Sequence, residues 1–205
     1  TNSDNNLKKF IGLELEQKNQ LYFQYALDLI DKIVSKSSID LNKITHIISI
    51  SCTGIKAPGL EIEIIKKYKL NTELTRFSVN FMGCYAAIHG LKLAKEICLN
   101  YPNAKILIVD IELCTLHFTG KNNIDDLNSS LLFGDGAALA LISNEEKGFK
   151  IDTAFSDVFL NGIDEMAWYP TSHFFKMRLS EKIPDLIKEY LDLNIDKLIH
   201  KFNLN

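Results

Sequence analysis

The sequence predicts an α/β fold in which helices flank a central sheet. Short β-branched runs that are apolar on both sides alternate with segments of helical periodicity, which is typical of a sheet buried between helices. The chain has 205 residues, 46% hydrophobic and 24% charged, which suits one globular domain or slightly more. The formal net charge of −3, without a basic stripe, argues against a nucleic-acid-binding protein.

The expected elements of the first half alternate in type: helix 21–34, strand 44–54, helix 57–70, strand 76–81, helix 84–102 and strand 104–113. The helices carry apolar residues near i, i+3, i+4 and i+7. Strands 44–54 and 104–113 are β-branched apolar runs typical of buried strands, and residues 76–81 are strand-like. Pro58 stands near the first turn of its helix, a position that tolerates proline.

The second half is less regular. Residues 119–130 form a polar excursion, and residues 148–159 are rich in apolar and small side chains. Between them, "FGDGAALAL" superficially resembles a phosphate-binding loop but lacks the GxGxxG spacing and leads into a strand, so we expect Asp135 to shape a turn. Residues 181–202 predict a last amphipathic helix that begins near Pro184.

The cysteines favour reduced thiols in a cytoplasmic protein. None forms a CxxC pair, and no histidine stands at zinc-ligand spacing from two of them, so we expect neither a disulfide framework nor a metal site. No run reaches the roughly 18–20 apolar residues of a membrane span, and the first ten residues lack an apolar stretch behind a basic flank, so we expect no signal peptide there. The four cysteines are Cys52, Cys84, Cys98 and Cys114.

Cys84 stands where a strand is expected to end and a helix to begin, in "NFMGCYAAIHG". A helix N-terminus presents unpaired N–H groups and a partial positive charge, so we expect the pKa of the Cys84 thiol to be lowered. The N–H groups of the turn could also stabilise an oxyanion, and Gly83 permits a sharp bend. The alternative is that Cys84 is only a small packing residue, and the bend alone favours that alternative.

Four stretches together resemble the type III polyketide synthases, the chalcone- and stilbene-synthase-like enzymes of the thiolase superfamily. They are "ITHIISISCTGIKAPG", "FMGCYAAIHGLKLAKE", "AKILIVDIELCTLHF" and "FGDGAALAL", in the order of the family. "EMAWYP" and "FFKMRLSEKIPDLI" resemble its bacterial branch. The resemblance implies a thiolase-like fold with helices around a mixed sheet. Residues 1–160 would form its N-terminal half, and residues 161–205 a pocket segment and the first helix of an incomplete C-terminal half.

By this resemblance Cys84 is the nucleophile of an acyltransferase. It would take an acyl group from an acyl-CoA starter and extend it by decarboxylative condensation with malonyl-CoA. The resemblance also implies a homodimer and no metal or organic cofactor. Ala57 matches a position that reaches across the dimer interface, while Phe149 and Met177 match the two gatekeepers of the CoA tunnel. The family's substrate-pocket positions fall on Cys52, Thr53, Ala57, Cys114, His117, Phe149, Trp168 and Met177.

Several alternatives stay open. His117 could be a core histidine with both ring nitrogens satisfied, and Cys114 could be structural. His89 follows Cys84 on the same helix, but side-chain direction and the family resemblance both argue against it as the base. A ketoacyl synthase III-like enzyme of fatty acid synthesis and a non-catalytic dimerisation remnant are the competing functions.

The resemblance also bears on completeness and substrate. The family's catalytic histidine and asparagine belong to its second half, so we expect this chain to be an internal segment of a larger enzyme, inactive in condensation by itself. Ala57 and the flexible Met177 favour a long-chain acyl starter and an alkylpyrone or alkylresorcinol product.

Overall fold

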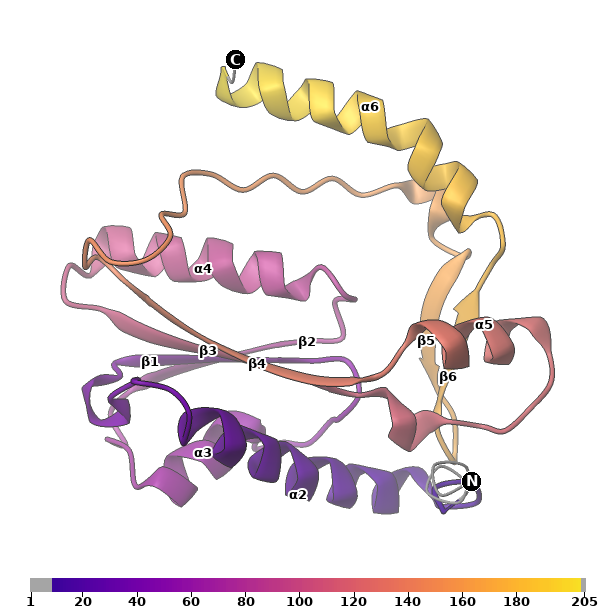
Figure 1. The fold of residues 1–205 in the computed structure, drawn as a ribbon, viewed down its shortest axis with the longest axis horizontal. Coiled ribbons are helices and arrows are strands. Elements are labelled where there is room, and N and C mark those ends of the chain that lie inside the picture. Colours follow the sequence, from indigo (N-terminus) through magenta and orange to yellow (C-terminus); the bar gives the residue numbers. More distant parts are fainter. Residues whose placement is uncertain (1–8, 204–205) are drawn as a thin grey trace.

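The computed structural model describes residues 9–203, in which a four-stranded sheet lies between two layers of helices (Figure 1). The strand order is β2-β1-β3-β4. β1, β2 and β3 are mutually parallel, and β4 joins β3 antiparallel at the edge. The sheet is therefore mixed, and the predicted α/β architecture is confirmed. The strands are β1 (His46–Ser51), β2 (Thr75–Asn80), β3 (Lys105–Leu113) and β4 (Asp135–Ser143).

The helices cover both faces of this sheet. Helices α2 and α3 lie on one face and α4 on the other (Figure 1). A capping box at Glu14 and Gln17 starts α2, six residues before the apolar periodicity that predicted it. The helices are α2 (Leu15–Val34), α3 (Leu60–Tyr68), α4 (Ala86–Asn100), α5 (Ile124–Leu132) and α6 (Ile183–Phe202), with short 3₁₀ turns at Leu41–Lys43, Cys114–His117 and Leu160–Gly162.

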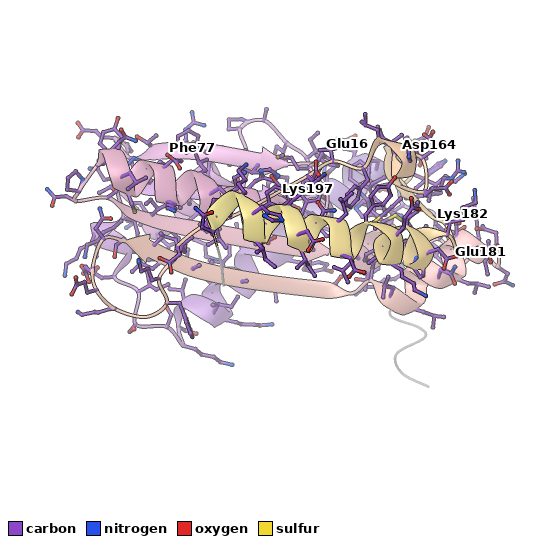
Figure 2. All side chains as sticks on the ribbon, turned by 90° about the horizontal axis from the view of Figure 1, so that it is seen from above. Glu16, Phe77, Asp164, Glu181, Lys182 and Lys197 are labelled. Carbon is purple, nitrogen blue, oxygen red and sulfur yellow. The ribbon has the colours of Figure 1, made fainter. Side chains whose placement is uncertain are left out.

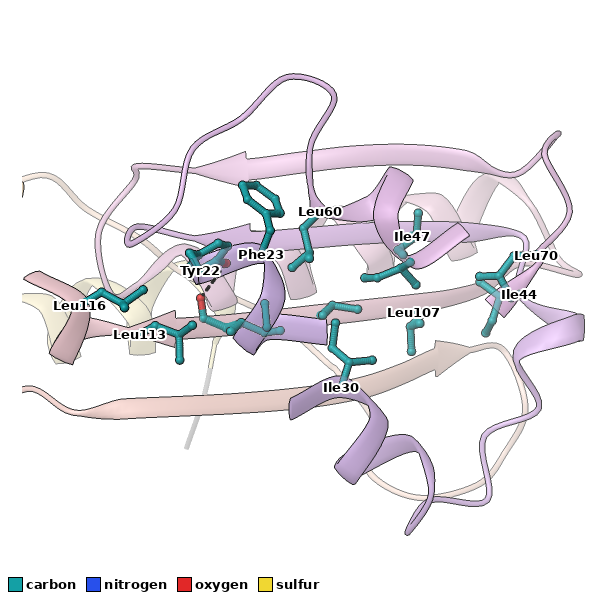
Figure 3. Close-up of a cluster of buried hydrophobic side chains, with 14 of the residues drawn as sticks. Tyr22, Phe23, Ile30, Ile44, Ile47, Leu60, Leu70, Leu107, Leu113 and Leu116 are labelled. Atoms are coloured by element: carbon teal, nitrogen blue, oxygen red, sulfur yellow. Dashed lines mark hydrogen bonds between the residues drawn. The ribbon is translucent and has the colours of Figure 1, made fainter. Parts of the chain in front are cut away.

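Two apolar cores hold the layers together. The core under α2 and α3 includes Ile47, Ile64 and Leu107, which are almost fully buried (Figure 3). The hydroxyl of Tyr22 donates to the carbonyl of Ile111 across this core, at 3.3 Å. The second core packs α4 against the opposite face of β1 and β3. β1 is buried along its whole length, as its isoleucine-rich sequence predicted.

A two-stranded antiparallel hairpin, β5 (Met166–Pro170) and β6 (Phe175–Leu179), follows the sheet. Residues 148–159, which lead into it, contain no helix or strand. Helix α5 contacts β6 and begins within the polar excursion, where the sequence pattern did not indicate a helix.

Helix α6 confirms the predicted last helix, but none of its residues is buried. It lies beyond α4, away from the sheet, and Figure 2 views it from above. Lys197 on this helix pairs with Asp157 at 2.6 Å, and Tyr190 stacks on Phe159 with ring centroids 4.4 Å apart. Within residues 9–203, no helix has the length and apolar character needed to cross a membrane.

Candidate active site

The parallel strands bring three chain segments to one edge of the sheet. β1, β2 and β3 run in the same direction, so the residues that follow them emerge together at their carboxyl ends. Cys52 follows β1, the turn that carries Cys84 follows β2, and Cys114 follows β3. The structure therefore gathers three of the predicted site cysteines around one edge.

Cys84 lies in a tight turn between β2 and α4, as predicted. We call residues 81–85 the nucleophile turn. Phe81 has a φ of +55° and Gly83 a φ of +92°, so the backbone enters the left-handed region twice within three residues. The Gly83 carbonyl accepts from the Ala86 N–H at 3.0 Å, and Cys84 itself is exposed. A side chain at position 83 would be strained by the φ and would approach the Tyr85 ring to 3.3 Å.

The carboxylate of Glu112, on β3, holds the loop that follows β1. Its Oε1 accepts from the Cys52 N–H and its Oε2 from the Thr53 hydroxyl, both at 2.7 Å. The Thr53 hydroxyl oxygen in turn accepts from the Leu113 N–H at 2.9 Å. Glu112 was not singled out from the sequence, although an acidic residue within the apolar run "ILIVDIEL" is a signal for such a role.

Cys52 connects this loop to the nucleophile turn. Its sulfur accepts from the Gly83 N–H at 3.3 Å, and its carbonyl accepts from the Trp168 indole N–H at 2.6 Å. Cys52 is thus held at its N–H, its carbonyl and its sulfur by three different segments of the chain. Trp168 comes from β5, so the hairpin also contributes to the site.

The expected lowering of the Cys84 pKa is wrong. Burial of the thiol, followed by the charge of Glu112, raises the pKa of Cys84 above its usual value, and the hydrogen bond from its own N–H only partly opposes this rise. The residue is exposed as a whole, yet the protein on its inner side removes enough water to disfavour the thiolate. Cys84 also precedes α4 by two residues, and Asp110 adds a second negative charge.

Burial shifts the pKa values of the other ionisable groups of the site as well. Burial raises the pKa of Glu112 to about 7, against the effect of the hydrogen bonds from Thr53 and Cys52. Burial and the charge of Glu112 raise the pKa of Cys114 to about 12, so its thiol is neutral at physiological pH. Desolvation therefore dominates the electrostatics of this site.

His117 is a neutral histidine with both ring nitrogens occupied. Its Nδ1 accepts from the Phe175 N–H at 3.1 Å, so the proton resides on Nε2, which donates to the Thr53 carbonyl at 2.8 Å. Only 5% of His117 is exposed, and burial lowers its pKa to about 4. His117 is thus a satisfied, buried histidine and does not have a free nitrogen to act as a base.

A cavity of about 90 Å³ lies beside this site. It is lined by four of the predicted pocket residues: Cys114, His117, Trp168 and Met177. Trp168 and Met177 face each other across the β5–β6 hairpin. The two hairpin residues therefore line the same cavity, and their role in substrate binding stays a prediction.

Two predicted pocket residues lie elsewhere. Ala57 is exposed on the loop between β1 and α3. Phe149 is fully exposed, at 103%, and lines a different cavity of about 620 Å³ together with Leu99. Ser143 at the end of β4 pairs with the first residue of β3, so Phe149 follows at the edge opposite to Cys84. The structure does not bring Phe149 to the site. In the part of the chain described here, no group of three or more His, Cys, Asp or Glu residues could hold a metal.

Comparison with known proteins gives consistent results. Residues 12–146 match the profile "Chalcone and stilbene synthases, N-terminal domain". The chain is 28% identical to a "Putative chalcone synthase" of Bacillus subtilis, covering 95% of this chain and 58% of that protein. It is also 28% identical to the "Alpha-pyrone synthesis polyketide synthase-like Pks18" of Mycobacterium tuberculosis, covering 84% of this chain and 47% of that protein.

A solved structure shares the fold. The C-terminal type III polyketide synthase domain of Steely1 from Dictyostelium superposes with a TM-score of 0.83 and 26% identity, covering 99% of this chain and 58% of that one. The chain spans about half the length of the relatives that it matches. The chain therefore belongs to the chalcone and stilbene synthase family and adopts the thiolase-like fold of the type III polyketide synthases.

Proposed function

We propose that this chain carries the nucleophile of a type III polyketide synthase and that Cys84 is that nucleophile. The observation that carries the proposal is the placement of one exposed thiol in the turn between β2 and α4, inside the region that matches the family. In the loading step the Cys84 thiolate attacks the carbonyl carbon of an acyl-CoA. The C–S bond to CoA breaks, the CoA thiolate leaves, and the acyl group stays on Cys84 as a thioester.

The extension step follows from the same resemblance. Malonyl-CoA loses CO2, and the resulting enolate carbon attacks the thioester carbonyl on Cys84, which releases the cysteine thiolate. The two steps together make acyl-CoA and malonyl-CoA the proposed substrates. The same proposal includes that the protein is homodimeric and cytoplasmic.

Activation of Cys84 needs a proton acceptor. The raised Cys84 pKa keeps the thiol protonated at neutral pH, and both nitrogens of His117 are already engaged. We assign the base to the histidine that the family resemblance places in the second half of the fold, so residues 1–205 by themselves should not condense malonyl-CoA. Loss of one oxyanion donor alone costs on the order of 3–4 kcal/mol of transition-state stabilisation.

The starter class is a finer part of the proposal. The small side chain of Ala57 and the flexible thioether of Met177 favour a long-chain acyl-CoA over a planar aromatic one. The pyrone named for the Mycobacterium relative agrees with an alkylpyrone product. Clearly faster turnover of p-coumaroyl-CoA than of a fatty acyl-CoA by the full-length enzyme would refute this choice.

Peptide-level mass spectrometry after incubation with an acyl-CoA tests the assignment of Cys84. We expect an acyl adduct on the Cys84 peptide that Cys84→Ala abolishes and that Cys98→Ala leaves intact, because Cys98 is buried in the core under α4. An adduct that persists in Cys84→Ala would refute the assignment. So would the absence of any adduct on the full-length enzyme. An adduct formed only from an acyl carrier protein thioester would favour the ketoacyl synthase alternative.

A further inference from the structure

Phe175 is the buried residue at which the hairpin, the cavity and the nucleophile turn meet. It is the first residue of β6, it is 3% exposed, and it lines the cavity of about 90 Å³. Its ring centroid lies 5.2 Å from that of Phe81, with the ring planes inclined at 70°. This edge-to-face geometry is favourable for two aromatic rings. Because Phe81 opens the nucleophile turn, the wall of the cavity and the turn that carries Cys84 share one side-chain contact.

The hairpin side of this contact is fixed by both of its strands. The N–H of Phe175 donates to Nδ1 of His117 at 3.1 Å, and the centroids of the two rings lie 4.6 Å apart. The other ring nitrogen of His117 donates to the carbonyl of Thr53 at 2.8 Å. Trp168, on the partner strand β5, donates to the carbonyl of Cys52 at 2.6 Å, and its ring centroid lies 5.8 Å from that of Phe175. The loop after β1 therefore holds both strands of the hairpin, and with them the position of the Phe175 ring.

The turn side of the contact has a strained backbone. Phe81 has a φ of +55°, which is unfavourable for a residue with a Cβ and persists only where neighbouring groups hold it. Its N–H donates to the carbonyl of Ser51 at 3.1 Å, one residue beyond the last pair of β1 and β2. Phe81 is 37% exposed, so the ring of Phe175 is an important part of the packing that restrains its side chain. Loss of that ring would let Phe81 relax, three residues before Cys84.

We propose that Phe175 is a positioning residue for Cys84: its ring holds Phe81 in the left-handed region and so fixes the turn that carries the thiol beside the cavity. The proposal rests on the proposed function in one respect, since it takes Cys84 as the residue that accepts the acyl group. Because Phe175 also lines the cavity, an acyl chain in the cavity would contact the same ring that supports the turn. Substrate binding and placement of the thiol are thereby coupled through one residue.

Two leucine variants and their combination test whether this one contact is responsible. Phe175→Leu and Phe81→Leu each remove one ring and keep an apolar side chain, and the double variant removes both rings. Phe81→Tyr keeps the ring at a partly exposed position, so it is the conservative variant that should restore the contact. Leu179→Ala is the matched control, because Leu179 is 8% exposed on the same face of β6 but is not among the residues that line the cavity.

The first readout is single-turnover loading of Cys84 by lauroyl-CoA in the full-length enzyme, followed on the Cys84 peptide by mass spectrometry at increasing lauroyl-CoA concentration. We expect each leucine variant to lower the saturating loading rate by about two- to tenfold, the range that one aromatic pair supplies. The half-saturating concentration should change in Phe175→Leu but stay within about twofold of wild type in Phe81→Leu, because Phe81 is not among the residues that line the cavity. The double variant should load no more slowly than the slower single variant, since both substitutions break the same contact. Phe81→Tyr and Leu179→Ala should load at the wild-type rate.

The second readout needs no acyl-CoA. Iodoacetamide in excess alkylates the exposed Cys84 thiol at a rate that is followed on the same peptide at pH 8. We expect alkylation to be at least about twofold faster in the two leucine variants than in Leu179→Ala, because a released turn opens more often and exposes the inner side of the thiol.

Wild-type loading in both leucine variants would overturn the proposal, and so would single effects on loading that multiply in the double variant. Equal slowing in Leu179→Ala overturns it as well, because general loss of packing in the hairpin then suffices. If Phe175→Leu does not fold, wild-type loading in Phe81→Leu overturns the proposal by itself. A wild-type enzyme that is alkylated on Cys84 but never acylated there contradicts the proposed function separately, and the alkylation rates of the variants then decide the positioning role.

Discussion

Glu112 and His117 should give opposite and nearly cancelling contributions to the pH dependence of stability. The pKa of His117 is about 4 in the folded protein against 6.5 in the unfolded chain, so on acidification the unfolded chain takes up the proton first. The free energy of unfolding then falls by about 1.4 kcal/mol per pH unit between pH 6.5 and 4. The pKa of Glu112 is about 7 in the folded protein against 4.5 unfolded, so the folded protein takes up that proton first, and the free energy of unfolding rises as the pH falls from 7 to 4.5.

Single substitutions should expose each contribution. His117→Gln removes the histidine titration and leaves that of Glu112, so acidification from pH 6.5 to 5 should raise the free energy of unfolding by up to about 2 kcal/mol relative to wild type. Glu112→Gln leaves the histidine titration, so the same acidification should lower the free energy of unfolding by a similar amount relative to wild type. Both side chains bond to Thr53, so each variant alters the same loop and serves as a structural control for the other.

Urea-induced unfolding followed by circular dichroism at pH 5.0, 5.5, 6.0 and 6.5 measures these slopes. Each variant is compared with itself across pH, so a uniform loss of stability from the substitution does not affect the result. If the free energies of unfolding of wild type and both variants change with pH in parallel, within about 0.5 kcal/mol, burial does not shift the pKa values of these two groups as described.

Three further outcomes follow from the geometry. Gly83→Ala should cost about 1–2 kcal/mol of stability in urea unfolding, because the φ of +92° strains any residue with a Cβ. The substitution should also change the alkylation rate of the adjacent Cys84 thiol. Wild-type values for both the stability and the alkylation rate would contradict the geometry of the turn. Trp168→Phe should cost at least about 1 kcal/mol, because it removes the hydrogen bond to Cys52 and leaves a smaller ring. A neutral effect on thermal unfolding would show that this bond does not form in solution. Ile64→Ala should cost about 2–5 kcal/mol, since its side chain is 0% exposed, whereas Leu131→Ala, 87% exposed, should stay within about 0.5 kcal/mol; equal effects would place the core elsewhere.

The elements of the sheet were predictable because local pattern and tertiary burial agree there. The β-branched runs at 46–51 and 105–113 are buried strands, and the periodicity after Cys84 continues as α4. Helix α5 was missed because its segment is polar and exposed, although Asn123, whose side chain accepts from the Asp126 N–H, is a recognisable N-cap. The start of α2 at Leu15 was missed for a similar reason, since a capping box rather than an apolar face begins that helix.

The same distinction between local sequence pattern and tertiary contacts decides which features of the site were predictable. The position of Cys84 depends on a strand, a glycine and a helix that are contiguous in sequence, so the sequence alone could place it. The hydrogen bond from Trp168 to Cys52 spans 116 residues, and only the tertiary fold brings its partners together. The acidity of the thiol is also a tertiary property: the helix N-terminus favours the thiolate, but desolvation and Glu112 outweigh it. The raised pKa disfavours the Cys84 thiolate at the sheet edge, so the proposed reactivity of Cys84 depends on a group that removes its proton.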